Sequence, residues 1–136
     1  MPTIFSRIIR KEIPSFKVAE NDRFYAFLDI RPINPGHTLV VPKIEIDEVF
    51  DLPAEWLTEI LPFAQPIARA LREATGQRIG MLVAGFEVPH AHLHLIPIAS
   101  EADLTFARAR PATDEDLQAM QARVWRALGL GSAEGR

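Results

Sequence analysis

The 136-residue sequence contains no cysteine. Disulfides, thiolate metal ligands and a cysteine nucleophile are therefore excluded. Basic residues are outnumbered as well: 15 Lys and Arg face 18 Asp and Glu, for a formal net charge of −3. This balance argues against nucleic acid or an anionic membrane as the main partner, because both select for basic surfaces. A small anionic ligand is still compatible with it.

Long apolar runs are also missing. No stretch approaches the ~20 apolar residues of a transmembrane helix, and charged residues interrupt the first 16 positions, unlike a signal peptide. We therefore expect no membrane partner and a cytoplasmic protein. With 48% hydrophobic residues, a chain of this length is expected to bury one core, as a single domain over residues 1–136.

The spacing of apolar residues predicts three helices and five strands. A short helix that includes Ile4, Phe5, Ile8 and Ile9 is expected before Pro14, and further helices are expected at about 54–75 and about 114–129. The strands are expected at residues 16–20, 23–30, 37–42, 78–84 and 90–98. Pro62 and Pro66 lie inside the middle helix, where each removes a backbone hydrogen bond, so a kink is an alternative to a straight helix. Residues 131–136 are expected to form a frayed tail. The order of elements predicts an α+β domain, an antiparallel sheet of about five strands with helices packed on one face.

Three of the four histidines stand in one short stretch, VPHAHLHLIP, at positions 88–97. Because side chains alternate along a strand, His90, His92 and His94 are expected to share one face, opposite Ala91, Leu93 and Leu95. A solvated polar face is one interpretation. A metal site, with Glu87 or His37 as a further ligand, is a second. A nucleophilic imidazole whose neighbours set its tautomer is a third.

Two segments, TIFSRIIRKEIPSFKVAENDRFYAFLDIRPINPGHTLVVPK and VPHAHLHLIP, resemble the histidine triad (HIT) family of nucleotide hydrolases and transferases, in particular its nucleotide-binding protein branch. The most specific parts are the H-x-H-x-H pattern and the segments NPGHTLVVPK and AFLDI. The resemblance runs from about Thr3 to Pro97. It implies a HIT-like core of about residues 3–98, followed by the C-terminal helix, and assembly as a homodimer.

The resemblance also implies the roles of the site residues. The middle histidine of such proteins is the nucleophile, so His92 would attack the α-phosphorus of a purine nucleotide conjugate and form a nucleotidyl-imidazole that water hydrolyses. His94 would assist the leaving group, and His90 and His37 would support and orient the other rings. Asp29 matches the carboxylate that binds the ribose hydroxyls.

The same resemblance places the nucleotide. The apolar slot for the base matches Phe5, Ile8, Phe27, Ile30 and Leu39. Backbone N–H groups of the turn from Gly85 through Glu87 to Val88 are candidates for phosphate binding, because turn amides bind anions.

Two departures from the family pattern stand out. Relatives commonly have a Gly-Gln pair before the histidine strand, whereas this chain has Gly85 followed by Phe86. Loss of a preorganised donor costs on the order of 10²–10³ in rate, so slow catalysis is an open alternative. Many bacterial relatives have a Cys-x-x-Cys and a further histidine where this chain has Thr3, Ser6 and Glu45. No structural zinc site can be built from these residues, and we expect neither a metal nor a cofactor.

Several functions stay open at this point. The expected substrate is a nucleoside 5′-phosphoramidate or a related nucleotide conjugate. The alternatives are a dinucleoside polyphosphate, a catalytically weak nucleotide-binding module and a metal-binding protein. For the expected dimer, Trp56 and Phe63 lie off the apolar stripe of the helix at 54–75 and are candidates for a contact surface; the alternative is that they cover loops or contact the C-terminal helix.

Overall fold

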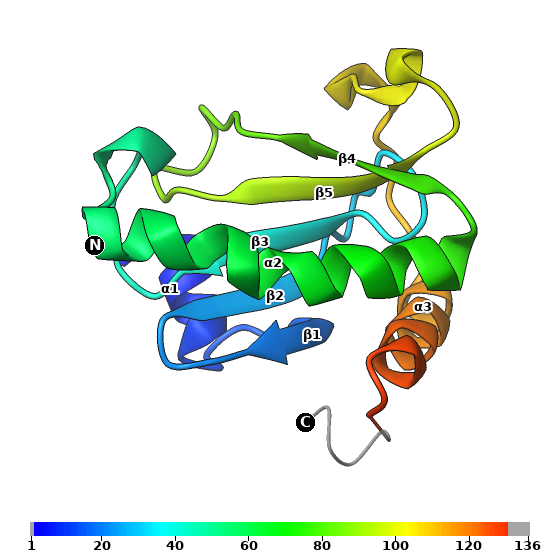
Figure 1. Cartoon of the computed structure of the whole chain (residues 1–136), viewed down its shortest axis with the longest axis horizontal. Coiled ribbons are helices and arrows are strands. Elements are labelled where there is room, and N and C mark those ends of the chain that lie inside the picture. Colours follow the sequence, from blue (N-terminus) through cyan, green and yellow to red (C-terminus); the bar gives the residue numbers. More distant parts are fainter. Residues whose placement is uncertain (1, 131–136) are drawn as a thin grey trace.

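A computed structural model describes residues 2–130, so the predicted tail at 131–136 lies outside the described residues. These residues form five strands and three α-helices, joined by short 3-10 helices (Figure 1). In order, these elements are α1 (Ile4–Ile9), β1 (Lys17–Glu20), β2 (Phe24–Leu28), β3 (Thr38–Pro42), η1 (Val49–Asp51), α2 (Ala54–Thr75), β4 (Arg78–Leu82), β5 (Leu93–Ile98), η2 (Glu101–Asp103), η3 (Phe106–Arg108) and α3 (Asp114–Ala127).

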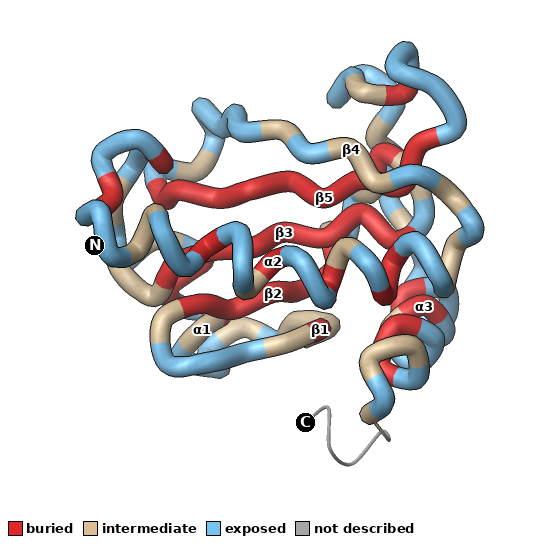
Figure 2. The backbone as a smooth tube through the Cα atoms, in the orientation of Figure 1, coloured by how far each residue is buried: buried red, intermediate tan, exposed pale blue. Residues whose placement is uncertain are grey.

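The five strands form one antiparallel sheet in the order β1-β2-β3-β5-β4. Every residue of β2, β3 and β5 is buried, whereas β4 at the edge is partly exposed (Figure 2). The inner strands are covered on both faces, so their sequences are apolar almost throughout. The predicted α+β class and the five-stranded antiparallel sheet are confirmed.

The long helix α2 crosses one face of the sheet (Figure 1). It runs unbroken from Ala54 to Thr75, through Pro62 and Pro66, both of which are exposed. Gly76 ends it in the left-handed conformation, with φ at 69°, which glycine adopts at little cost. The buried side of α2 packs on the sheet through Ile60, Ala64, Ile67, Ala70 and Leu71. Burial of this stripe positions the sheet against the helix.

The C-terminal helix α3 packs against α2 and the end of β1. Two of its side chains, Gln121 and Trp125, donate hydrogen bonds to the backbone carbonyl of Lys17, at 2.9 and 3.0 Å. The neighbouring carbonyl, of Phe16, accepts from Leu28 at the end of β2. The Lys17 carbonyl therefore belongs to the outer edge of β1, and α3 occupies it.

Helix α1 corrects one detail of the predicted architecture. Whereas α2 and α3 share one core, α1 lies behind the sheet in Figure 1. Phe5 and Ile8 of α1 pack against Tyr25, Phe27 and other residues on the second face. Helices thus cover both faces, since an apolar stripe shows that a helix is buried without showing on which face of the sheet.

Trp56 and Phe63 of α2 are half-buried and pack against the edge of the core. Phe63 stacks on Phe24 of β2 with ring centroids 5.4 Å apart, and Trp56 meets the same ring edge-on at 5.7 Å. Arg23 lies over the Trp56 ring. The large Phe24 side chain extends the core beyond the regular helical stripe and gives both half-buried rings a packing partner within the chain. Their part in a dimer contact stays a prediction. The exposed apolar groups here are Leu61 of α2, 53% exposed, and Met81 of β4, 49% exposed.

Strand β5 begins later than predicted, at Leu93 in place of residue 90. Ahead of it, the backbone N–H of Ala91 donates to the carbonyl of Ile46 at 2.7 Å, so this stretch pairs with the segment after β3 and not with the ladder. The alternation of faces nevertheless holds: Ala91 and Leu93 lie in the core under α2, while His92 contacts Phe5 on the other face.

None of the helices within residues 2–130 combines the length and the apolar character needed to cross a bilayer.

Candidate active site

All four histidines of the chain are buried and lie close together at the junction of β3 and β5. Their exposed fractions run from 0% for His90 to 8% for His92. The His92 and His94 ring centroids are 4.9 Å apart, and His94 is 5.1 Å from His37 of the adjacent strand segment. The structure therefore brings together the four imidazoles that the sequence singled out.

One neutral tautomer of His92 fits its surroundings. Its Nδ1 lies 2.7 Å from the backbone carbonyl oxygen of His90. Because a carbonyl oxygen only accepts, this nitrogen carries the ring proton. Among the described residues Nε2 has no hydrogen-bond partner, so its lone pair is free. The arrangement presents an unprotonated nitrogen that can attack an electrophile.

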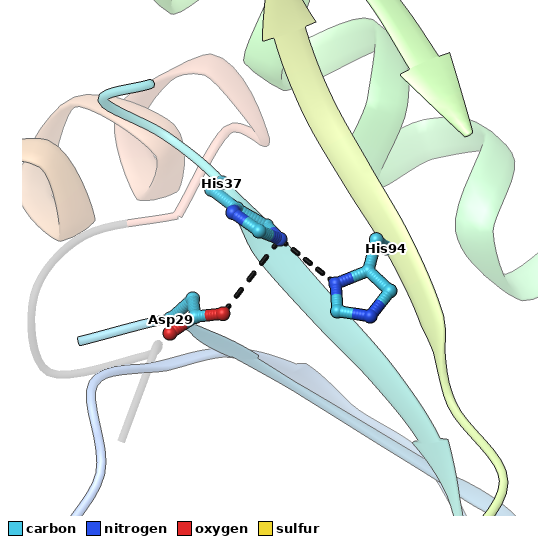
Figure 3. Close-up of side chains that lie close together, drawn as sticks. All are labelled: Asp29, His37 and His94. Atoms are coloured by element: carbon cyan, nitrogen blue, oxygen red, sulfur yellow. Dashed lines mark hydrogen bonds and ion pairs between the residues drawn. The ribbon is translucent and has the colours of Figure 1, made fainter. Parts of the chain in front are cut away.

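His37 and His94 form a chain of hydrogen bonds with a single direction. The backbone N–H of Ile33 donates to Nδ1 of His37 at 3.0 Å, which places the His37 proton on Nε2. That nitrogen lies 2.9 Å from Nδ1 of His94 (Figure 3). His94 then carries its own proton on Nε2, which faces the carbonyl of Ala84 at 3.3 Å. His94 thus offers an N–H donor on the side of the site where His92 lies.

Burial keeps both of these rings neutral. Burial, with smaller contributions from nearby His94 and His92, lowers the pKa of His37 to about 3. Burial and, to a smaller extent, His92 lower the pKa of His94 to about 4, against an opposing hydrogen bond to the Ala84 carbonyl. At physiological pH the pair therefore acts through its N–H groups and lone pairs, without a positive charge.

Asp29 stands at the end of β2 beside this pair. Its Oδ1 accepts a hydrogen bond from the backbone N–H of Arg31 at 2.9 Å, and its Oδ2 lies 3.7 Å from Nε2 of His37. Burial raises the pKa of Asp29, while the Arg31 hydrogen bond opposes that rise. The second oxygen keeps acceptor capacity for a ligand hydroxyl.

A metal ion could in principle bind among the side chains of Asp29, His37 and His94. Their possible ligand atoms all lie within 4.8 Å of one another. The two ring nitrogens that face each other are, however, joined by a hydrogen bond at 2.9 Å. An ion at this position would have to displace the proton shared by the two rings. The positions where relatives have cysteines hold the hydroxyls of Thr3 and Ser6. Hydroxyl groups are not the sulfur and nitrogen donors of a structural zinc site.

The apolar residues predicted to hold the base are brought together with one exception. Phe5, Ile8, Phe27 and Leu39 belong to a single buried cluster, against which Val88 packs. Phe5 meets Phe27 and His92 edge-on, at 5.7 and 5.0 Å between centroids. Ile30 is 62% exposed and stands apart from this cluster.

The turn before the histidines lies directly against the His92 ring. A Cβ added at Gly85 would sit 2.3 Å from Cε1 and 2.6 Å from Nε2 of His92. Any side chain at this position would therefore fill the space in front of Nε2. Phe86 and Glu87 are exposed, so neither side chain covers the ring. Beside His92 and Gly85 opens a cavity of about 500 Å³, lined also by Asp47, Glu48, Val49, Phe50, Val83, Ala84, Phe86 and Ala91.

Several contacts of the site were not predicted from the sequence. Thr3 hydrogen-bonds the His90 ring, and Phe106 of η3 meets His94 edge-on at 5.0 Å. Phe106 lies beyond the stretch that resembles the family, so its residue type offered no signal. Ile33 acts through its backbone N–H, which all residues except proline have, and Ala84 acts through its carbonyl, so only the fold places them.

Known proteins resemble the chain in both sequence and structure. A family model described as HIT domain matches residues 10–101. Adenosine 5′-monophosphoramidase HNT1 of Saccharomyces cerevisiae is 45% identical over 101 residues, 72% of this chain and 63% of that protein. A HIT-like protein involved in cell-cycle regulation from Bartonella henselae superposes with a TM-score of 0.81 at 32% identity, covering 92% of this chain and 95% of the other. A Zn-bound histidine triad family protein from Mycobacterium smegmatis gives a TM-score of 0.79 at 30% identity, covering 93% and 92%.

Proposed function

The chain belongs to the HIT domain family, and from that membership we propose that it is a nucleotide hydrolase. In this proposal it cleaves a nucleoside 5′-phosphoramidate or a related nucleotide conjugate at the α-phosphate. The intermediate is a nucleotidyl group bound covalently to His92, and the product is a purine nucleoside monophosphate.

The observation that carries the proposal is the hydrogen bond from Nδ1 of His92 to the carbonyl of His90, at 2.7 Å. It holds the ring proton away from Nε2, the nitrogen beside Gly85 and the cavity. A neutral imidazole oriented in this way is a good phosphorus nucleophile, and a covalent intermediate divides one difficult displacement into two easier ones. Water then attacks the phosphorus, the bond from phosphorus to Nε2 breaks, and one proton of that water passes to solvent, which restores neutral His92.

His94 supports departure of the leaving group. Its Nε2–H, set by the hydrogen bond from His37 to Nδ1, donates to the departing nitrogen and stabilises the charge that develops there. The amine completes its valence with a proton from solvent. His37 holds the tautomer of His94, as the Ile33 N–H holds that of His37.

The nucleoside lies on the α1 side of the sheet. The buried cluster of Phe5, Ile8, Phe27 and Leu39 offers an apolar wall for a base, and Asp29 offers a carboxylate for the ribose hydroxyls. Backbone N–H groups from Gly85 to Val88 face the phosphate, in place of the glutamine amide that Phe86 replaces.

The cavity beside His92 favours a phosphoramidate over a dinucleoside polyphosphate. Its lining includes the carboxylates Asp47 and Glu48 and the rings of Phe50 and Phe86. Carboxylates at this position repel a chain of further phosphates, whereas a neutral or cationic amine is tolerated or attracted. The Saccharomyces cerevisiae relative, named as a monophosphoramidase, also supports this choice. The match to this relative covers 63% of its length. The substrate of the present protein is therefore proposed and not taken over from the relative.

The proposal includes a homodimer and a cytoplasmic location. Strand β4 is an edge strand with no strand beyond it among the described residues. Next to it Leu61, Ala68, Ile79 and Met81 line an apolar hollow between α2 and β4. A two-fold contact along this edge would pair β4 with its copy and bury the hollow.

Steady-state release of nucleoside monophosphate tests the activity. Two substrates, a nucleoside phosphoramidate and a diadenosine polyphosphate, are compared with and without chelator. We expect chelator-insensitive turnover of the phosphoramidate. Preference for the polyphosphate would favour the dinucleotide alternative. Tight nucleotide binding without turnover would favour a binding module, and loss of activity with chelator would favour metal chemistry.

A further inference from the structure

Thr3 joins the first turn of α1 to the histidine cluster. Its hydroxyl oxygen accepts the backbone N–H of Ser6 at 3.1 Å, as the N-cap of the helix. The same oxygen lies 2.6 Å from Nδ1 of His90, 87 positions away in the chain. One hydroxyl therefore serves both the helix and the site.

The direction of the contact between Thr3 and His90 follows from the other ring nitrogen. Nε2 of His90 lies 2.8 Å from the carbonyl oxygen of Pro42, so the ring proton is on Nε2. Nδ1 must then accept, and the Thr3 hydroxyl donates to it. Burial also lowers the pKa of His90, which keeps the ring neutral. The longer 3.3 Å contact from Thr3 to the Ser6 hydroxyl is the weaker competitor for that proton.

The carboxylate of Glu45 holds Thr3 from the other side, through its backbone. The backbone N–H of Thr3 donates to Oε1 of Glu45 at 2.8 Å. The Ser6 hydroxyl also hydrogen-bonds this carboxylate and lowers the pKa of Glu45. Thr3, Ser6 and Glu45 are the positions where many bacterial relatives have two cysteines and a histidine. Here they join α1, the segment after β3 and His90 through hydrogen bonds.

We propose that Thr3 is a positioning residue for the nucleophile His92. With both ring nitrogens bonded and no exposed surface, the His90 side chain has one orientation. His90 is also the residue whose carbonyl binds Nδ1 of His92, at 2.7 Å. Loss of the Thr3 hydroxyl frees the His90 ring, and through the same residue it loosens the carbonyl that sets the tautomer and direction of His92. The inference rests on the proposed function, since it concerns the group that attacks the substrate.

Four variants test the role of Thr3. Thr3→Val removes the hydroxyl at nearly constant shape, and Thr3→Ser restores it. Thr3→Asp keeps an acceptor for the helix cap but has no proton to donate to His90. Thr113→Val is the matched control, because Thr113 caps α3 by the same contact, to the N–H of Asp116, away from the histidines. The readouts are kcat and KM on a nucleoside phosphoramidate and the ring ¹⁵N chemical shifts of His90 and His92.

We expect Thr3→Val and Thr3→Asp to lower kcat by about tenfold with KM within about twofold, as misplacement of a reacting group does. Both variants should shift the ring ¹⁵N signals of His90 and His92. Thr3→Ser and Thr113→Val should match the wild type in kcat and in these signals.

Two outcomes would overturn the role. In the first, Thr3→Val and Thr3→Asp keep the wild-type kcat and leave the ring ¹⁵N signals unchanged. A defect confined to KM is the other, because it would mean that α1 and Phe5 have moved and the nucleophile has not. If the wild type turns over no conjugate at all, the proposed function fails and the ring signals alone judge Thr3: unchanged signals reject it, and shifted signals support it.

Discussion

Nε2 of His37 lies 2.9 Å from Nδ1 of His94, although 57 positions separate the two residues in the chain. Between them is a single proton, donated by His37 because Ile33 occupies its other nitrogen. A second proton between these two nitrogens would place two facing N–H groups against each other in a buried site. The pair is therefore stable only while both rings are neutral.

The first prediction is a loss of stability on mild acidification. In the unfolded chain histidine protonates near pH 6.5, whereas the folded pKa values are about 3 for His37 and about 4 for His94. In the window between, the unfolded state binds more protons. The free energy of unfolding should therefore fall as the pH drops below about 6.5, by up to about 1.4 kcal/mol per pH unit for each ring. Above that pH both states are neutral and the pair adds no slope.

Urea unfolding between about pH 7.5 and pH 5 measures this slope. The matched control is the double variant His37→Gln/His94→Gln, which is expected to be less stable but to show a shallower dependence on pH. An equal slope in the variant and in the wild type would show that other groups cause the acid sensitivity.

Replacement of the nucleophile should separate chemistry from binding. His92→Ala removes the attacking nitrogen but leaves Asp29 and the apolar cluster, so turnover should be abolished while the Kd of nucleoside monophosphate stays within about tenfold. His94→Ala should retain some activity on substrates with good leaving groups. Steady-state kinetics and calorimetry measure the two quantities, and wild-type-like turnover in His92→Ala would remove it from the nucleophile role.

A single methyl group at Gly85 should block the site. In Gly85→Ala the new Cβ would lie 2.3 Å from Cε1 of His92, so either the ring or the turn must move. We expect kcat to fall by about 100-fold, since a displacement of this size misaligns the attacking atom. Gly129→Ala is the control: no atom lies within 4 Å of its added Cβ, and its positive φ costs stability without touching the histidines. Equal activity in both variants would mean that the turn at Gly85 can move away from His92 without loss of function.

The proposed dimer can be tested by charged substitutions in the apolar hollow between α2 and β4. Light scattering on a size-exclusion column should give twice the 15.2 kDa of one chain. Leu61→Glu or Met81→Glu should reduce it to one chain, because each adds a carboxylate to an apolar contact. Ile4→Glu, at a similarly exposed apolar position on α1, should leave the dimer intact. A monomeric wild type at micromolar concentration would reject the assembly, and a dimer that tolerates both edge variants would reject this surface.

The sequence predicted most of the helices and strands. It failed where backbone hydrogen bonds alone determine the start of a strand. The 22 residues of α2 carry a long amphipathic signal with a glycine stop, so the helix predicted at about 54–75 agrees with Ala54–Thr75 in the structure. The alternation of His92 against Leu93 also held. The start of β5 was missed because the Ala91 N–H bonds a carbonyl 45 positions earlier, at Ile46, and no side chain marks such a contact.

The candidate site shows the same division. The H-x-H-x-H pattern and the NPGH segment identified all four histidines, and the structure brings them together. What sets their tautomers was not visible in the sequence, because the carbonyls of Pro42, His90 and Ala84 are groups that every residue has. Thr3 could be read only as a position where cysteine was missing. Its partnership with His90 depends on where α1 lies relative to the sheet, which the sequence left open.

The two borders of the sheet differ, and the difference bears on how many copies can join. At β1 the side chains of Gln121 and Trp125 already occupy the outward carbonyl of Lys17. At β4 the described residues offer no such cover. If two copies join along β4, each uses up its one accessible border, and the combined ten-stranded sheet ends on both sides in a β1 strand occupied by α3. Growth would then stop at a closed pair and would not run on into a filament.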